Sequence, residues 1–87
     1  MLEVKKFSAT WCGPCKSLVP LMNEIKMQFP TGVRFIDYDV DTEKLAAAQY
    51  GVNSVPTVIF VKDGVELKRI TGLNSKSAYI NAINESK

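Results

Sequence analysis

The chain has 87 residues, 46% of them hydrophobic, and its 11 Lys and Arg residues against 9 Asp and Glu residues give a net charge of +2. This length and composition predict a single domain with an apolar core over residues 1–87. The small, interspersed charge argues against nucleic-acid binding, and 2 cysteines are too few for a disulfide-dependent secreted scaffold.

The N-terminal third predicts a strand followed by an amphipathic helix. Residues 2–7 alternate between apolar and polar side chains, as a half-buried strand does. Over residues 13–29 the apolar side chains recur every three or four positions, which is the spacing of one helix face. Pro14 falls in the first turn, where a missing N–H costs little, whereas Pro20 falls inside the helix and predicts a kink.

A second strand and a short helix are predicted next. Residues 33–40 predict the strand. Asp41 or Thr42 is the expected N-cap of a helix over residues 43–50, because short side chains with an oxygen accept hydrogen bonds from the free N–H groups there. Gly51 is expected to end this helix.

The remaining sequence predicts a hairpin and a final helix. Residues 57–62 are the most hydrophobic and β-branched run of the chain, so we expect this strand at the centre of the sheet. Asp63-Gly64 is typical of a tight turn, and residues 65–71 predict the returning strand. Asn74 or Ser75 is the expected cap of the last helix.

The predicted order is therefore strand, helix, strand, helix, strand, strand, helix. A strand–helix–strand opening implies parallel pairing with a right-handed crossover, whereas the closing hairpin must be antiparallel. We expect an α/β domain in which helices pack on both faces of a mixed four-stranded sheet.

Cys12 and Cys15 lie in FSATWCGPCKS, where the first predicted strand meets the first predicted helix. With no histidine in the chain, these two thiols cannot complete the four ligands of a zinc site, so no metal site is expected. A structural disulfide across so short a loop would restrain few unfolded conformations. An incidental pair of buried cysteines would not explain why both lie at a strand–helix junction.

This junction favours redox chemistry. The free N–H groups and the dipole at a helix N-terminus stabilise an anion, so a thiol there loses its proton more readily. We expect Cys12 at the exposed start of the helix and Cys15 one turn further in, less accessible. Cys12 would attack a substrate disulfide, and Cys15 would resolve the mixed disulfide and leave a Cys12–Cys15 disulfide.

At these residues the chain resembles a thioredoxin, and the resemblance covers nearly its whole length. WCGPCK at residues 11–16 matches the family's active-site motif, and Pro20 matches its helix kink. SVPT at residues 54–57 resembles the loop with the family's cis-proline, DG at 63–64 its hairpin and TGL at 71–73 its substrate-facing glycine loop. The resemblance implies a thioredoxin-like fold and a small protein-disulfide reductase that carries electrons in its dithiol.

The resemblance also implies roles for individual residues. Cys12 is then the attacking thiol and Cys15 the resolving one, and the bond before Pro56 is cis. The implied substrate-docking surface comprises Trp11, Gly13, Pro14, Val55, Pro56 and Gly72. The implied partners are an NADPH-dependent thioredoxin reductase, which recharges the disulfide, and disulfide-containing proteins, with ribonucleotide reductase as one candidate; no bound cofactor is implied.

The chain departs from the family in two ways. Typical thioredoxins have a further strand and helix before the active-site strand, so we expect an uncovered sheet edge here and partial exposure of Glu3 and Lys5. Lys6 replaces the family's buried aspartate, and Asp37 replaces the lysine that usually faces it. We expect a partly buried Lys6–Asp37 pair beneath Cys15, with Asp37 as proton acceptor. The alternative is that both side chains are solvated.

Other interpretations stay open at this point. A glutaredoxin-like, glutathione-dependent enzyme is one, although glutaredoxins usually have Tyr in the motif and paired glycines where only Gly72 stands. An oxidase or isomerase of a secretory compartment is another, and a non-catalytic subunit that binds through the active-site face is a third. Residues 1–10 have no secretory apolar run, and no segment has the roughly 20 apolar residues of a membrane helix, so we expect a soluble, cytoplasmic monomer.

Overall fold

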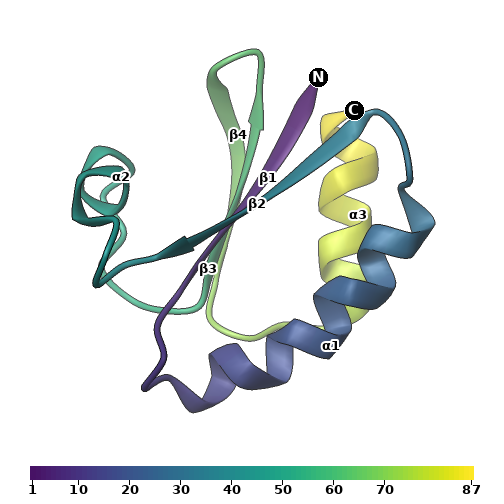
Figure 1. Cartoon of the computed structure of the whole chain (residues 1–87). Coiled ribbons are helices and arrows are strands. Elements are labelled where there is room, and N and C mark those ends of the chain that lie inside the picture. Colours follow the sequence, from purple (N-terminus) through teal and green to yellow (C-terminus); the bar gives the residue numbers. More distant parts are fainter.

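In the computed structural model, which describes residues 1–87, the helices and strands follow the predicted order (Figure 1). They are β1 (Leu2–Ser8), α1 (Gly13–Gln28), β2 (Val33–Asp39), α2 (Lys44–Gln49), β3 (Thr57–Lys62), β4 (Val65–Thr71) and α3 (Lys76–Ser86). Every predicted range agrees with the structure to within 1 residue at each end. The local sequence patterns therefore determine where these elements lie.

The strands form one mixed sheet in the order β2-β1-β3-β4. β1 runs parallel to β2 and antiparallel to β3, and β3 and β4 form an antiparallel hairpin. The hairpin turns at Asp63 and Gly64, whose φ angles of 51° and 84° are those that a type I′ turn requires. The structure confirms the predicted mixed sheet and the inner position of β3, and it leaves β2 as an edge strand, as expected.

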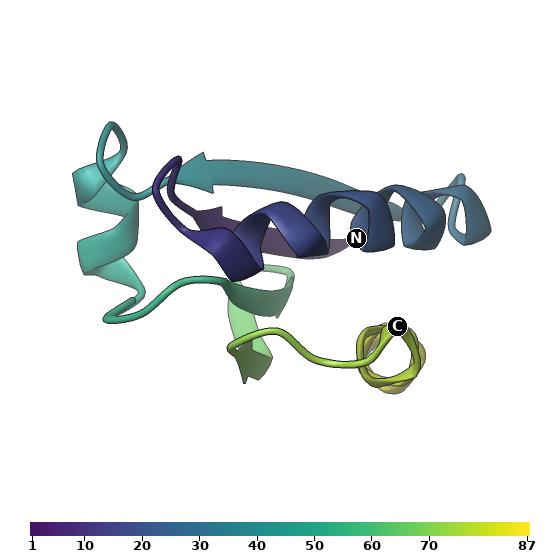
Figure 2. The ribbon, with the colours of Figure 1, turned by 90° about the horizontal axis from the view of Figure 1, so that it is seen from below.

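Helices cover both faces of the sheet, as predicted. α1 and α3 lie against one face, and the short α2 covers part of the opposite face (Figure 1 and Figure 2). Because side chains alternate along a strand, each strand contributes to both faces, which we call the α1/α3 face and the α2 face. The α1/α3 face holds the larger buried cluster: Leu2, Val4, Leu18, Met22, Ile25, Val58, Phe60, Tyr79, Ala82 and Ile83.

The α2 face is less apolar. Its buried cluster consists of Phe7, Ile59 and Val61 from the strands and Ala47 from α2. Charged residues continue the same face: the side chains of Glu3 and Lys5 are 27% and 12% exposed, which confirms their predicted partial exposure. This face is therefore covered by a mixture of apolar and charged side chains.

The helix termini agree with prediction except at the start of α2, which ends at Tyr50 and Gly51 as expected. Ser75 caps α3, where its Oγ accepts a hydrogen bond from the Ala78 N–H at 3.2 Å. The predicted capping of α2 by Asp41 or Thr42 is wrong: Glu43 occupies the N-cap position, and its side chain makes no capping hydrogen bond. The Asp39 carbonyl oxygen instead accepts the Glu43 N–H at 2.8 Å. None of the helices is long and apolar enough to cross a membrane.

Candidate active site

The two cysteines lie between β1 and α1 and form a disulfide bond. The chain turns after β1, and the Cys12 N–H donates to the Ala9 carbonyl oxygen at 3.2 Å. Cys12 is the N-cap of α1, and its Sγ accepts a hydrogen bond from the Cys15 N–H at 3.1 Å. The Cys12 sulfur thus occupies the position where the end of a helix stabilises a negative charge.

The burial of Cys12 differs from the sequence-based expectation. Only 4% of Cys12 and 3% of Cys15 are exposed, so the predicted exposure of Cys12 is wrong for this disulfide form. Ala9 is buried with the two cysteines, and Val40 and Val55 pack against them. The motif could not reveal this burial, because Val40 and Val55 come from distant parts of the chain.

Trp11 lies on the surface next to the disulfide, with 69% of its surface exposed. Its Nε1 donates a hydrogen bond to Asp41 Oδ2 at 2.9 Å. From sequence, Asp41 is expected only as a helix cap, since no pattern links two residues 30 positions apart. Gly13 and Pro14 follow as exposed residues at the start of α1. The indole therefore stands at the rim of the site, held by a carboxylate from the β2–α2 loop.

A second loop brings the other predicted docking residues to the same end of the molecule. The Val55–Pro56 peptide bond is cis, as the resemblance implies. Gly72, with a φ of 83°, donates its N–H to the Pro56 carbonyl oxygen at 2.8 Å, which joins the glycine loop to the proline loop. The buried Tyr79 hydroxyl donates to the Gly72 carbonyl oxygen at 3.3 Å, and burial raises the pKa of this hydroxyl.

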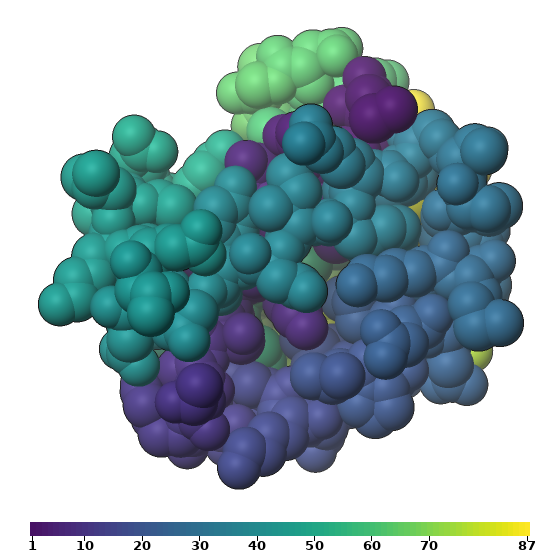
Figure 3. Space-filling model, in the orientation of Figure 1, coloured from purple at the N-terminus to yellow at the C-terminus, as the bar shows by residue number.

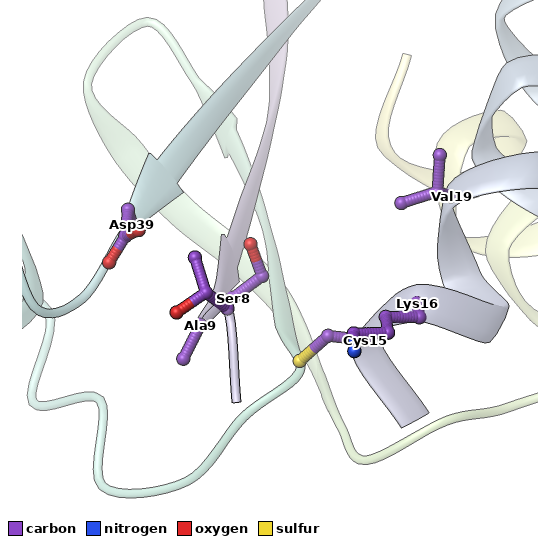
Figure 4. Close-up of a pocket in the computed structure, with 7 residues that line it drawn as sticks. Ser8, Ala9, Cys15, Lys16, Val19 and Asp39 are labelled. Carbon is purple, nitrogen blue, oxygen red and sulfur yellow. The ribbon is translucent and has the colours of Figure 1, made fainter. Parts of the chain in front are cut away.

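Two hollows lie beside the disulfide. The smaller, about 110 Å³, is lined by Trp11, Val40 and residues 52–55. The larger, about 370 Å³, is lined by Ser8, Ala9, Thr10, Cys15, Lys16, Val19 and Asp39 (Figure 4). In the space-filling view, the segment before α1 adjoins the α2 region at the surface (Figure 3). Asp39 and the residues around the smaller hollow, Val40 and 52–54, were not identified as site residues from sequence.

Lys6 and Asp37 form the ion pair that the exchanged charges predict. Lys6 Nζ lies 3.5 Å from Asp37 Oδ1, and the two strands place the residues directly opposite each other. The pair is asymmetric, because the Lys6 side chain is 10% exposed and that of Asp37 is 58% exposed. Neither residue lines the hollow at Cys15, and Asp39 is the one carboxylate in its lining. The interpretation that both side chains are solvated is therefore wrong for Lys6.

The chemistry available at this site is thiol–disulfide exchange. The Cys12–Cys15 disulfide can open to two thiols, and the Cys15 N–H and the helix end favour the thiolate at Cys12. No group of three or more His, Cys, Asp or Glu side chains is placed to hold a metal ion.

Known proteins share this sequence and fold. The family model for thioredoxin matches residues 2–85. The chain is 39% identical over 84 residues to a thioredoxin of Chlamydia muridarum, covering 97% of this chain and 81% of that protein. It is 40% identical over 79 residues to a thioredoxin of Mycobacterium tuberculosis, covering 91% of this chain and 68% of that protein. The crystal structure of Fasciola hepatica thioredoxin matches with a TM-score of 0.92 and 38% identity, over 99% of this chain and 81% of that one.

These matches agree with the thioredoxin resemblance and not with the glutaredoxin alternative. They extend over both loops of the site, so the active-site motif is not an isolated similarity. The chain therefore belongs to the thioredoxin family, and it is a thiol-disulfide oxidoreductase whose redox-active pair is Cys12 and Cys15.

Proposed function

We propose that this single-domain chain reduces disulfides in other proteins, with Cys12 as the attacking thiol and Cys15 as the resolving thiol. The observation that carries the assignment is the hydrogen bond from the Cys15 N–H to Cys12 Sγ at the start of α1. Because this donor and the helix dipole favour a negative charge on Cys12, Cys12 is the better nucleophile of the two.

The reaction then has two exchange steps. The Cys12 thiolate attacks one sulfur of the substrate disulfide, forms a mixed disulfide and releases the other substrate sulfur as a thiolate that takes up a proton. Cys15 gives up its proton and attacks Cys12 Sγ, which releases the second substrate thiol. Two electrons thus pass to the substrate, and the Cys12–Cys15 disulfide remains.

The docking surface is assigned to the residues around the disulfide: Trp11, Gly13, Pro14, Val55, Pro56 and Gly72. The exposure of Trp11 and the packing of Val55 against the cysteines support this assignment. The hydrogen bond between Gly72 and Pro56 places both loops beside each other. A substrate segment lying across these residues would bring its disulfide to Cys12.

Lys6 and Asp37 are assigned to the proton transfer at Cys15. The support is the Lys6–Asp37 ion pair: in this proposal the Lys6 ammonium favours the Cys15 thiolate, and the exposed Asp37 carboxylate passes the proton to water. The test is the Asp37→Asn variant, in which the pH dependence of mixed-disulfide resolution should shift. An unchanged pH dependence would remove both residues from the mechanism.

The cellular role follows from this chemistry. The chain would act as a cytoplasmic monomer that carries electrons from an NADPH-dependent thioredoxin reductase to disulfide-containing proteins, ribonucleotide reductase being one candidate. The family membership supports these partners, and the small balanced charge supports a role apart from nucleic acid.

The redox potential of the Cys12–Cys15 couple is the measurement that tests this function. Equilibration with defined glutathione ratios should give a value near that of known thioredoxins, about −270 mV. A value near about −180 mV would instead indicate an oxidase or isomerase.

Cysteine variants separate the reductase from a binding subunit. Cys15→Ser should accumulate a mixed disulfide with a protein substrate, and Cys12→Ser should form none. If both variants form the same complexes with partner proteins as the wild type and keep its function, the chain acts by binding alone.

A further inference from the structure

We propose that Arg69, held in place by Glu66, is a positioning residue for the loop over residues 51–56 and so determines how well a protein substrate docks. This proposal rests on the reductase function proposed above. Neither residue belongs to the motifs of the active site, and both lie on β4, at the sheet edge away from the disulfide.

The Arg69 guanidinium is fixed by three hydrogen bonds. Its Nε donates to Glu66 Oε2 at 2.8 Å and its Nη2 to Glu66 Oε1 at 2.8 Å, which is a bidentate pair. Its Nη2 also donates to the Tyr50 carbonyl oxygen at 2.6 Å. The side chain of Arg69 is 30% exposed and that of Glu66 36% exposed, so the pair is partly shielded from water. Hydrogen bonding to Glu66 raises the pKa of Arg69, and the same bond lowers the pKa of Glu66.

Tyr50 is where the docking loop begins. It is the C-cap of α2, and the carbonyl groups at the end of a helix have no partner within the helix. Gly51 follows with a φ of 62°, and the Val52 N–H donates back to the Ala47 carbonyl oxygen at 2.9 Å. Arg69 thus binds the residue from which the chain leaves α2 toward Val55 and Pro56.

A second cation holds the side chain of Tyr50. Lys5 Nζ lies 5.3 Å from the centroids of both the Tyr38 and the Tyr50 rings and donates a hydrogen bond to the Tyr38 hydroxyl at 3.1 Å. Tyr50 therefore accepts a hydrogen bond from Arg69 at its carbonyl oxygen and contacts Lys5 through its ring. Both cations come from the sheet, so they tie the end of α2 to a rigid support.

The far end of the loop has its own anchors. Thr57 Oγ1 donates to the Ser54 carbonyl oxygen at 2.8 Å, and Gly72 donates to the Pro56 carbonyl oxygen at 2.8 Å. Arg69 and Lys5 therefore hold the start of the loop, whose residues 52–55 line the same hollow as Trp11. A shift of this wall would change the surface that receives a protein substrate, whereas Cys12 and Cys15 would stay on α1.

The test compares Arg69→Met with Lys68→Met. Lys68 is the adjacent residue on β4, but it pairs with Glu85 of α3 on the other face and is a matched control. Reduced protein is mixed with insulin, a protein disulfide, and with dithiobis(nitrobenzoate), a small disulfide that needs no docking loop. For Arg69→Met we expect the second-order rate constant with insulin to fall about two- to fivefold, the range of a partly exposed charged contact, and the rate with the small disulfide to stay unchanged. Arg69→Lys keeps the charge but not the bidentate geometry, so its rate constant with insulin should lie between those of the wild type and Arg69→Met.

Amide hydrogen exchange gives a second readout that does not depend on activity. In Arg69→Met, exchange at Gly51 and Val52 should accelerate, while exchange in β1 and α3 should match the wild type. An insulin rate equal to that of Lys68→Met, or unchanged exchange at Gly51 and Val52, would overturn the proposal. A wild-type protein that reduces neither disulfide would refute the reductase function, and the exchange data would still decide whether Arg69 positions the loop.

Discussion

The α1/α3 face and the α2 face of the same sheet are covered from solvent in different ways. On the α1/α3 face, 10 buried residues form one cluster between the strands and two helices. On the α2 face the corresponding cluster has 4 buried residues, and the charged residues Glu3, Lys5, Glu66 and Arg69 lie on the same face. One face is thus covered by two long helices, and the other by the short α2 together with charged side chains of its own strands.

The difference shows how charged side chains can complete the burial of a strand residue that a short helix covers only in part. Ile59 lies between Lys5 and Arg69 in the cross-strand register, and it is 0% exposed. The methylene groups of long charged side chains cover apolar neighbours while their charged ends remain hydrogen-bonded or solvated. On this face, the cations of Lys5 and Arg69 therefore add to the cover that the short α2 provides.

The largest effect is expected on the α1/α3 face. Phe60→Ala removes a fully buried ring from that cluster and should lower the free energy of unfolding by about 3–5 kcal/mol, measured by urea denaturation. Leu67→Ala, at a residue 48% exposed on β4, is the control and should change it by about 0.5 kcal/mol. Similar losses in the two variants would mean that the α1/α3 face is not the main source of stability.

The next effect probes the α2 face. Lys5→Ala removes the cation between Tyr38 and Tyr50 and uncovers Ile59, so the free energy of unfolding should fall by about 1–2 kcal/mol. Lys5→Met keeps most of the aliphatic stem and should lose roughly half as much. Lys44→Ala, on an exposed side chain, should be neutral. If Lys5→Ala also leaves the free energy of unfolding unchanged in urea denaturation, the charged side chains do not stabilise this face.

Removing a buried polar atom on the α1/α3 face is expected to raise the free energy of unfolding. Ser86 is 3% exposed in α3, and its Oγ has no hydrogen-bond partner. Ser86→Ala should raise the free energy of unfolding by about 1 kcal/mol, because the unpaired hydroxyl is removed and alanine favours a helix. Thermal unfolding measures the change, and a lower melting temperature would show that the hydroxyl is satisfied in solution.

The smallest effect is a pH dependence on the α2 face. Arg69 lowers the pKa of Glu66 in the folded state, so the contribution of this pair is present above the unfolded pKa and is lost as the pH falls through the folded value. Because the carboxylate is partly exposed, the loss should be at most about 0.5 kcal/mol. Glu66→Gln should remove this part of the acid dependence, and identical acid profiles for variant and wild type would leave the pair without a role in stability.

Most of the fold could be predicted because its signals are local. The alternation in residues 2–7, the helical spacing in 13–29 and the turn at Asp63-Gly64 each depend on a few neighbouring residues, and the structure confirms them. The redox pair could also be predicted, since Cys12 and Cys15 lie within one turn of a helix start. The predicted N-cap of α2 was wrong because the Asp39 backbone carbonyl accepts the Glu43 N–H, a contact that the sequence does not indicate.

The contacts that shape the site are not local, and the sequence did not reveal them. The hydrogen bonds from Trp11 to Asp41 and from Arg69 to Tyr50 join residues 30 and 19 positions apart. The shielding of Cys12 likewise depends on Val40 and Val55, which only the folded sheet brings near it. The pairing of Lys6 with Asp37 could be expected because the resemblance to thioredoxins implies two facing charges at these positions, and the register of β1 and β2 confirms it.

The placement of the chain ends has a practical consequence for tethering. Met1 and Lys87 lie together at the upper end of the view in Figure 1, and the segment between β1 and α1 lies at the lower end. The Met1 amino group also pairs with Asp63 in the β3–β4 turn, at 3.1 Å. A linker attached at either terminus would therefore leave the disulfide facing outward. The molecule could be fused to another protein or immobilised on a bead with its redox centre free to meet large substrates.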